Sequence, residues 1–388
     1  MSEETMKKYR YLLMLGHMFT DINQGALPAI IPFLIASQGL SYASAASLVL
    51  AANLVSSFVQ PFIGYLGDKK SRPWFMSVGI FLAGLGVAFL GFSPSFFVSC
   101  LLASLSGIGV AMFHPEGGKI ANYVAGSKKG SGMSIFAVGG NLGFAIGPII
   151  TSIALSIWGI KGSIVLIIPA TIMSFVMFYF NQKLTDISVV KKSNHGSSEN
   201  KEVEKDDWLS FSKVVSLIFC RSILLYALTT FIPLFFISQF LVSEASANGN
   251  LTIYSLVGVF ATLFGGRLAD YFGLNRLIKF GFAILAPLIF FFINGNHLGL
   301  TMFLIIPISF AMNCTYGSLI ALSQSFVPNR IGLASGISLG LSVSIGGLLA
   351  PIIGIVGDKY GLEVAMYIIF GFAVLGFLLT FIMPKESK

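Results

Sequence analysis

The first long apolar stretch of the chain carries side chains that could exchange a proton. His17, Asp21, Gln24 and Pro28 follow one another at spacings of four, three and four residues, which places them on one face of a helix. Ionisable groups at the depth of a bilayer are costly and usually face a cavity or one another. We therefore expect a polar cavity wall on which Asp21 takes up a proton and His17 and Gln24 contact a ligand. A purely structural hydrogen-bond network between helices is the alternative.

A second group of such residues lies in "AMFHPEGGK", residues 111–119, late in another apolar stretch. His114 and Glu116 point about 200° from each other on a regular helix, unless Pro115 distorts the turn. Glu116 and Lys119 have the spacing of an ion pair along one helical face. The segment is therefore either a kinked helix with an internal ion pair or a proton switch that uses His114 or Glu116. A carboxyl group that loses contact with water holds its proton more tightly, and we expect Glu116 to carry the proton.

Arg221 is the one Arg or Lys deep within a predicted membrane span. Because arginine stays charged in proteins, it needs an anionic partner, which could be Asp21, Glu116 or an anionic ligand. A permanent structural pair with Asp21 is the alternative. As a ligand contact, a buried arginine suits anionic or zwitterionic compounds better than cations, which it would repel. Weaker candidates for ligand contacts, each of which could equally hold helices together, are Phe136, Asn141, Tyr226, Asn313 and Tyr316.

The elements that position these side chains are membrane helices. Of the 388 residues, 55% are hydrophobic and only 10% are charged, whereas soluble domains carry about 25% charged residues. Apolar stretches of roughly 18–28 residues follow one another, and each is long enough to cross a bilayer. The net charge of +8 does not indicate nucleic-acid binding, because the basic residues are scattered through the breaks between stretches. The three cysteines lie inside apolar stretches and predict neither disulfides nor a metal site.

The sequence predicts an all-α integral membrane protein with twelve transmembrane helices in two six-helix bundles. The predicted spans are 9–37, 42–66, 74–92, 95–123, 132–157, 162–181, 211–239, 245–268, 276–294, 299–326, 332–356 and 363–383. The polar stretch 183–210 is predicted to be a flexible cytoplasmic linker between bundles 1–182 and 211–388. Lys and Arg concentrate at both ends of the chain and in alternate loops, so both termini are predicted to be cytoplasmic.

The two halves resemble each other at an offset of about 200 residues. "IPFLIASQ" (31–38) is similar to "IPLFFISQ" (232–239), and "GFAIGPII" (143–150) is similar to "GGLLAPII" (346–353). Under the same offset Asp68 falls on Asp270. Two parallel six-helix repeats, with substrate bound near the midplane of the bilayer, are the architecture of major facilitator transporters.

Three further motifs narrow this resemblance. "GYLGDKKSRP" (64–73) has the form G-x-L-x-D-x-x-x-R and resembles the loop between helices 2 and 3 of the major facilitator superfamily. "FHPEG" (113–117) together with "GGNLGFAIGPI" (139–149) resembles the fosmidomycin-resistance branch of that superfamily. The resemblance implies an inner-membrane exporter driven by the proton gradient. It is densest in the N-terminal half, so the ligand need not be a phosphonate antibiotic.

Four charged residues are candidates for a gate. Asp68, Arg72, Asp270 and Arg276 lie at predicted cytoplasmic helix ends, where charge pairs and helix-end interactions could stabilise one state of a transport cycle. Helix capping and topology are the alternative roles.

Other classes of protein are not expected. The sequence contains no G-x-x-x-x-G-K-[ST] phosphate loop, and H-P-E is not the H-E-x-x-H zinc motif. We therefore expect no ATP-driven pump, no enzyme, no cofactor and no metal. The expectation is a multi-pass protein of the bacterial inner membrane that acts as a monomer and exports small anionic or zwitterionic compounds or drugs in exchange for protons, conferring drug resistance. A proton-coupled uptake symporter for a small organic anion is the alternative.

Overall fold

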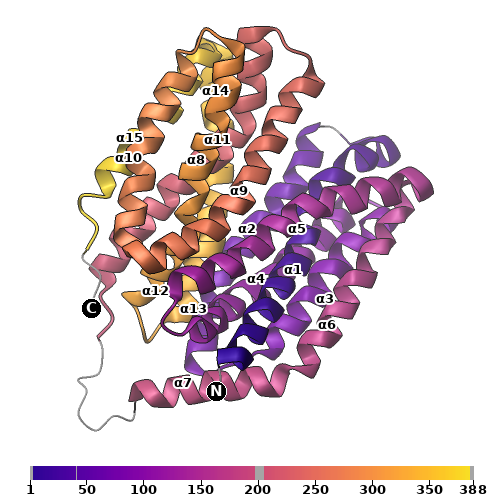
Figure 1. Ribbon diagram of the computed structural model, residues 1–388. Helices are drawn as coiled ribbons and strands as arrows, with labels where there is room; N and C mark the ends of the chain where they lie inside the picture. Colours follow the sequence, from indigo (N-terminus) through magenta and orange to yellow (C-terminus); the bar gives the residue numbers. More distant parts are fainter. Residues whose placement is uncertain (1–2, 41, 197–204, 385–388) are drawn as a thin grey trace. The chain divides into compact units, whose positions relative to one another are not determined.

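A computed structural model of the chain describes residues 3–40, 42–196 and 205–384. Within these ranges the chain is helical and contains no strand (Figure 1). The α-helices are α1 (Glu3–Gln38), α2 (Tyr42–Lys69), α3 (Trp74–Ala88), α4 (Phe96–Ala125), α5 (Lys129–Trp158), α6 (Ile167–Tyr179), α7 (Asn181–Gly196), α8 (Trp208–Phe240), α9 (Glu244–Phe272), α10 (Leu274–Ile293), α11 (Leu298–Cys314), α12 (Tyr316–Ser325), α13 (Ile331–Ser335), α14 (Ser342–Tyr360) and α15 (Leu362–Leu379). Short stretches of tighter or wider helix, which adjoin the α-helices, are η1 (Phe89–Phe92), η2 (Gly159–Leu166) and η3 (Gly336–Leu341).

The predicted all-α membrane fold is confirmed. Across the described ranges, eleven uninterrupted helical stretches are long and apolar enough to cross a bilayer. One of them, Lys129–Tyr179, has 51 residues, and about 20 suffice for one crossing. Because η2 interrupts the stretch between α5 and α6, Lys129–Tyr179 is counted as two crossings. The total is then the twelve crossings that the sequence predicts.

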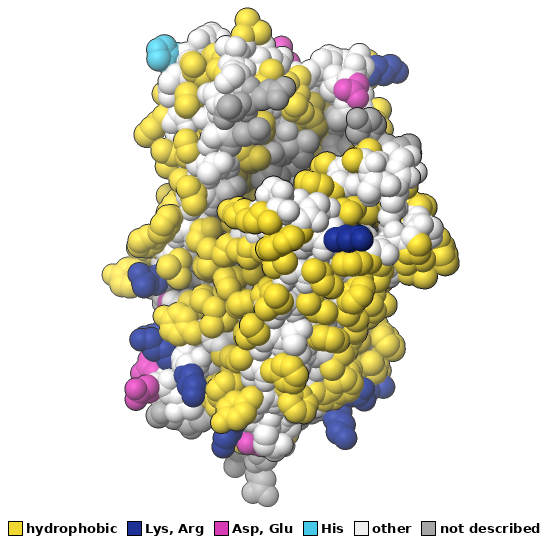
Figure 2. Space-filling view, turned by 90° about the vertical axis from the view of Figure 1, so that its right-hand side faces the viewer, with side chains coloured by type: hydrophobic (Ala, Val, Ile, Leu, Met, Phe, Trp, Pro, Cys, Tyr) yellow, Lys and Arg dark blue, Asp and Glu magenta, His cyan; other side chains and the backbone are white. Residues whose placement is uncertain are grey.

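Large hydrophobic side chains remain on the outside of the helices. Phe58 is 72% exposed, Phe175 is 70% exposed and Phe97 is 69% exposed. Hydrophobic side chains dominate the face drawn in Figure 2, and only a few charged groups interrupt them. Lipid tails can cover such surfaces without a free-energy cost, because they are as apolar as these side chains.

The chain falls into two compact units that are interleaved along the sequence. Unit 1 comprises Met1–Ser127, Ile135–Asp206 and Val327–Leu341, and unit 2 comprises Lys128–Ser134, Asp207–Phe326 and Ser342–Lys388. Each unit therefore includes a short segment from the other half of the sequence. In unit 1, α13 and η3 pack against α2. The two exchanged segments correspond to each other under the repeat offset of about 200 residues. The division into bundles at the linker stays a prediction.

The stretch 183–210 differs from the expected flexible linker. Helix α7 covers Asn181–Gly196 and buries Leu184 and Ile187, because it packs against α4 and α6. The expectation is therefore wrong for its first part, since tertiary contacts stabilise a helix that the sequence pattern does not show. Residues 197–204 of the linker and the C-terminal residues 385–388 lie outside the described residues.

The end of this stretch forms the N-terminal cap of α8. The carboxylate of Asp207 accepts a hydrogen bond from the backbone N of Ser210 at 3.0 Å and one from the Ser210 hydroxyl. These two bonds hold the pKa of Asp207 below its usual value, because they favour the charged form.

Glycines bring α5 against α1 in unit 1. A Cβ atom at Gly139 would clash with the backbone carbonyl of Met14, and one at Gly143 would lie 2.5 Å from the carbonyl oxygen of Met18. Close helix approach of this kind is a common use of small residues in membrane proteins. The glycine-rich middle of α5 therefore lies directly against the polar stripe of α1.

Candidate functional site

Three titratable side chains form a buried cluster in unit 1. The carboxylate of Asp21 lies 3.2 Å from Nε2 of His17 through its Oδ2 atom and 3.0 Å from Nε2 of His114 through its Oδ1 atom. His17 and Asp21 come from α1, one turn apart, and His114 comes from α4. All three side chains are buried, with relative exposures of 3–5%. The structure thus brings together the polar stripe of α1 and the histidine of "AMFHPEGGK".

Aromatic rings enclose His17. Its ring stacks on Phe136 of α5 at a centroid distance of 4.2 Å and meets the ring of His114 edge-on at 4.9 Å. Phe113 lies nearly parallel to the His17 ring at 6.1 Å. Nδ1 of His17 lies 2.8 Å from the backbone carbonyl oxygen of Phe136. Phe136 therefore holds His17 through both its ring and its backbone.

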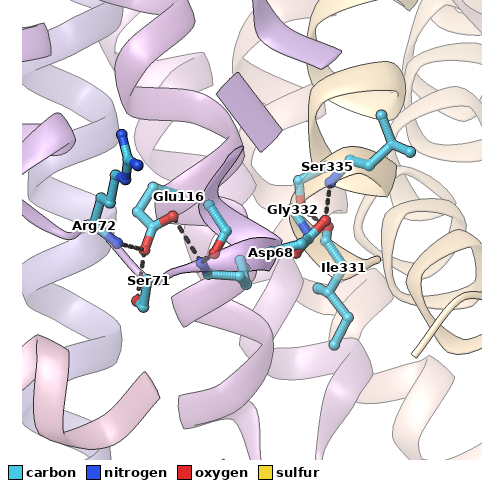
Figure 3. A network of polar contacts seen from close by, with 10 residues as sticks. Asp68, Ser71, Arg72, Glu116, Ile331, Gly332 and Ser335 are labelled. Atoms are coloured by element: carbon cyan, nitrogen blue, oxygen red, sulfur yellow. Dashed lines mark hydrogen bonds and ion pairs between the residues drawn. The ribbon is translucent and has the colours of Figure 1, made fainter. Parts of the chain in front are cut away.

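Glu116 belongs to a different network, which Figure 3 shows. Its Oε2 accepts a hydrogen bond from Lys119 Nζ at 2.7 Å, and its Oε1 accepts from the Ser71 hydroxyl at 2.9 Å and from the backbone N of Arg72 at 3.1 Å. Lys119 Nζ also donates to the carbonyl oxygen of Gly67 at 2.8 Å. Through these hydrogen bonds the buried ion pair links α4 to the end of α2 and to the loop that follows it.

Helix α4 runs without a break through Pro115. His114 and Glu116 therefore keep the separation of about 200° that a regular helix imposes. One turns toward α1 and the other toward the end of α2. Of the two, His114 is the residue that contacts Asp21, and the expectation that Glu116 carries the proton stays a prediction.

Arg221 occupies a separate position in unit 2. Its Nε donates to the carbonyl oxygen of Met312 at 3.2 Å, and an Nη atom lies 3.4 Å from Oδ1 of Asn313. The guanidinium lies over the ring of Tyr316, 4.3 Å from its centroid. The helix breaks between α11 and α12 beside these contacts, at Thr315, which leaves backbone carbonyls available to accept. No carboxylate of the described residues forms an ion pair with Arg221.

The two candidate gate aspartates each bind the start of a helix. Asp68 accepts from the backbone N of Gly332 at 2.8 Å and of Leu333 at 2.9 Å, in the first turn of α13 within unit 1. Asp270 accepts from the backbone N of Gly130 at 2.8 Å and of Ser131 at 3.0 Å, in the first turn of α5 within unit 2. Such N–H groups have no partner within their own helix, and a carboxylate there is favoured by the helix dipole.

The remaining candidates are less closely connected to these groups. The guanidinium of Arg72 lies over the ring of Phe75 at 5.5 Å, and Arg276 is exposed. Gln24, Asn141 and Tyr226 are half-buried on α1, α5 and α8. The structure therefore joins only some of the residues that the sequence nominates.

The side chains of the buried cluster are of types that can bind a metal ion. Among the described residues, His17, Asp21 and His114 form the one group of three whose candidate ligand atoms lie within 4.8 Å of one another. Two imidazoles and a carboxylate can bind zinc. In this structure, however, both Nε2 atoms already contact Asp21 at hydrogen-bond distances.

Several functional contacts were not nominated from the sequence. Ser71 and Phe113 were not singled out, and the carbonyl of Phe136 and the N–H groups of Gly332 and Leu333 are backbone atoms. A signal existed for Ser71 and Phe113, because they lie inside the motifs "GYLGDKKSRP" and "FHPEG".

Comparison with known proteins identifies the family of the chain. The sequence model described as Major Facilitator Superfamily matches residues 13–351 and, in a second match, residues 214–388. The MFS-type transporter YfnC of Bacillus subtilis is 30% identical, over 100% of this chain and 97% of its own length. The fosmidomycin resistance protein of Escherichia coli is 26% identical, over 96% of this chain and 92% of its own.

Solved structures show the same fold. The transporter FucP in an outward conformation matches with a TM-score of 0.75 at 14% identity, over 98% of this chain and 99% of that chain. The proton:xylose symporter XylE matches with a TM-score of 0.75 at 15% identity, over 99% of this chain and 97% of that chain. The matched family and the fold are those of multi-pass membrane carriers of small molecules. The chain belongs to the Major Facilitator Superfamily.

Proposed function

We propose that this transporter exports small anionic or zwitterionic compounds in exchange for protons. The observation that carries the proposal is Arg221, a buried guanidinium with no carboxylate partner among the described residues. An uncompensated buried charge is costly, so Arg221 favours a ligand that brings its own negative charge. Asn313 and Tyr316 hold the guanidinium in place for that ligand.

The proton part of the exchange rests on the cluster of His17, Asp21 and His114. A buried carboxylate in contact with two imidazoles can gain and lose a proton without leaving an isolated charge. Glu116 is the weaker candidate, because Lys119, Ser71 and Arg72 already satisfy its carboxylate. We therefore favour Asp21 and His114 over Glu116 as the coupling residues.

Alternating access would follow from the pair of helix-end aspartates. Asp68 and Asp270 occupy equivalent places in the two sequence repeats and each holds the start of a helix from the other repeat. We propose that these contacts form in one state of the cycle and break in the other as bundle 1–182 moves against bundle 211–388. The protein would lie in the bacterial inner membrane with both termini in the cytoplasm.

A ligand screen tests the anion part of the proposal. Purified full-length protein is heated with anionic, zwitterionic and cationic compounds, fosmidomycin among them because a 26% identical relative is named for resistance to it. A compound that binds the folded state raises the unfolding temperature. We expect stabilisation by anionic or zwitterionic compounds, and stabilisation by cations alone would contradict the proposal.

A transport assay tests the direction. Relatives also include a proline/betaine transporter of Escherichia coli, 23% identical over 84% of this chain, so a proton-coupled uptake symporter is the second candidate. The labelled stabilising compound is placed inside proteoliposomes, and a pH gradient that drives protons inward is imposed. An exporter that exchanges the compound for protons releases it faster under this gradient, whereas a symporter releases it faster when the gradient drives protons outward. Release that does not depend on the imposed pH gradient would contradict both candidates.

A further inference from the structure

One ring nitrogen of His17 faces a backbone carbonyl oxygen, which only accepts hydrogen bonds, and the other faces a carboxylate oxygen, which only accepts while Asp21 is ionised. Nδ1 lies 2.8 Å from the carbonyl oxygen of Phe136. A carbonyl oxygen cannot donate, so Nδ1 must carry a hydrogen and donate it. In the neutral form of the ring, the other nitrogen, Nε2, is then left with a lone pair and no hydrogen.

That lone pair would face an oxygen that also accepts. Nε2 of His17 lies 3.2 Å from Oδ2 of Asp21, and both side chains are buried with exposures of 3%. Two acceptors at this distance, away from water, repel each other. A proton or a metal ion must lie between them for the observed contact to be favourable, and a proton goes to the imidazole nitrogen, which is more basic than a carboxylate oxygen.

We propose that this species is a proton on Nε2 of His17, which makes the His17–Asp21 pair the site that holds the transported proton. The inference rests on the proposed proton coupling and, within the cluster of His17, Asp21 and His114, assigns the proton to His17, a residue that the sequence nominates only for ligand contact. The ring is an imidazolium that donates to Phe136 through Nδ1 and to Asp21 through Nε2. Asp21 is the carboxylate that balances its charge.

The hydrogen-bond partners distinguish His17 from His114. Nε2 of His114 donates to Oδ1 of Asp21 at 3.0 Å, whereas Nδ1 of His114 is buried and has no hydrogen-bond partner. A second proton on His114 would bury an N–H group without an acceptor, which costs about 1–3 kcal/mol. His17 has an acceptor for each of its two N–H groups.

The surroundings of the pair stabilise the charged form of His17. The ring of Phe136 stacks on it at 4.2 Å, and aromatic faces attract cations. His114 donates to Asp21 and so stabilises the carboxylate that faces the imidazolium. In the described helices around the pair, His114 is the one other titratable side chain in contact with it.

Loss of this proton would force α1 and α5 apart. A Cβ atom at Gly140 of α5 would lie 2.7 Å from both Nε2 of His17 and Oδ2 of Asp21, so the backbone of α5 closes over the pair. Without the proton, the two acceptors need water or a new donor between them, and the closed packing leaves no room for one. Deprotonation is therefore linked to separation of the helices.

Nitrogen-15 NMR of the histidine rings tests the proposal without any transport substrate. The full-length chain, which contains four histidines, is labelled with nitrogen-15 histidine and placed in lipid nanodiscs at neutral pH. We expect one ring with both nitrogens protonated that persists in His114→Gln and is lost in His17→Gln. In Asp21→Asn the amide can donate to Nε2, so the same ring should become singly protonated, on Nδ1. This last shift also assigns the ring if His17→Gln does not fold.

Three outcomes would overturn the inference. The first is a neutral His17 ring in the unmodified protein, and the second is an imidazolium that Asp21→Asn leaves unchanged. The third is one equivalent of a divalent metal in the purified protein whose removal by a chelator shifts the His17 nitrogens, because a metal ion would then occupy the place of the proton. Failure of the export assay leaves this measurement unaffected, so the two proposals fail separately.

Discussion

At the scale of single residues, the buried charged groups fall into three kinds that differ in how their charge is balanced. Glu116 and Lys119 balance each other directly. Asp21 is balanced by imidazoles that can change their charge. Arg221 has backbone, amide and aromatic neighbours but no carboxylate among the described residues. Stability, proton exchange and ligand binding are therefore expected to depend on different residues.

Removing one partner of the Glu116–Lys119 pair should destabilise the protein. Glu116→Gln leaves the ammonium of Lys119 with the carbonyl of Gly67, and Lys119→Met leaves the carboxylate with Ser71 and Arg72. Breaking a buried pair costs about 3–5 kcal/mol, because one charge stays buried without compensation. We expect each single variant to lower the thermal unfolding temperature in detergent.

The double variant Glu116→Gln/Lys119→Met is the matched comparison for these singles. It removes both charges, so it should recover most of the loss in unfolding temperature. Additive losses in the double variant would show that the two groups act independently. A large loss of proton coupling with unchanged unfolding temperature in Glu116→Gln would return the coupling role to Glu116.

Replacing Arg221 should weaken binding of an anionic ligand. In Arg221→Ala the positive charge that compensates the ligand is lost, and we expect at least tenfold lower affinity for the anion found in the screen, or a loss of about 1.4 kcal/mol or more of binding free energy, measured from the dependence of the unfolding temperature on ligand concentration. Arg267→Ala removes an exposed arginine of α9 and serves as the control. Unchanged affinity in Arg221→Ala would assign Arg221 a structural role.

At the scale of helices, glycine determines how closely α5 approaches α1, and aspartate determines how α5 and α13 begin. Both effects depend on the backbone: a missing Cβ at Gly139, Gly140 and Gly143 admits a neighbouring helix. Carboxylates bind the free N–H groups of a first helical turn. The close packing around the proton site therefore depends on glycines, which have no ionisable side chain.

Gly139→Ala should destabilise the protein because the added methyl group would meet the backbone carbonyl of Met14. Overpacking of this kind costs about 1–3 kcal/mol. Gly371→Ala on α15 is the control, since no atom lies within 4 Å of the added Cβ there, and helix propensity predicts no loss. Equal unfolding temperatures for the two variants would contradict the close α1–α5 packing.

Replacing either helix-end aspartate should destabilise the first turn of the helix that it contacts. Asp68→Asn removes the negative charge at the first turn of α13, and Asp270→Asn removes it at the first turn of α5. A loss of about 1 kcal/mol corresponds to roughly fivefold faster hydrogen exchange. Mass spectrometry should locate the faster exchange at Gly332 and Leu333 in the first variant and at Gly130 and Ser131 in the second. Each variant is the control for the other, and exchange that rises equally at both places would contradict the assignment.

At the scale of the whole molecule, the hydrophobic exterior and the alternation of basic loops predict one orientation in the membrane. Lys128 lies in a loop predicted to be cytoplasmic, and Lys161 lies in one predicted to face outward. Both side chains are exposed, so both can be replaced by cysteine for labelling.

A membrane-impermeant maleimide tests this orientation in intact cells. In a background without Cys100, Cys220 and Cys314, Lys161→Cys should react directly, whereas Lys128→Cys should react only after the cells are permeabilised. Labelling of Lys128→Cys in intact cells would reverse the proposed orientation. Both termini would then be placed outside.

The sequence by itself determined the membrane fold, the number of crossings and the internal repeat of this protein. These properties follow from the length and apolar character of each stretch, which are local. It also separated His114 from Glu116, since two residues on a regular helix must point in different directions. It failed at α7, where packing against α4 and α6 stabilises a helix in a polar stretch.

Only the tertiary structure decided which polar groups meet. His114 could have faced the ligand, the lipid or Asp21, and its place beside Asp21 depends on the packing of α4 against α1. The backbone carbonyl of Phe136 determines that Nδ1 of His17 carries a hydrogen. Backbone N–H groups in the first turns of α13 and α5 donate to Asp68 and Asp270. These are backbone atoms, so the side chains at those positions do not reveal the contacts. A sequence states which side chains are available, whereas a hydrogen bond requires two atoms within about 3 Å. For partners more than 90 residues apart in the chain, as in His114 and Asp21, that distance is set only by how the helices pack.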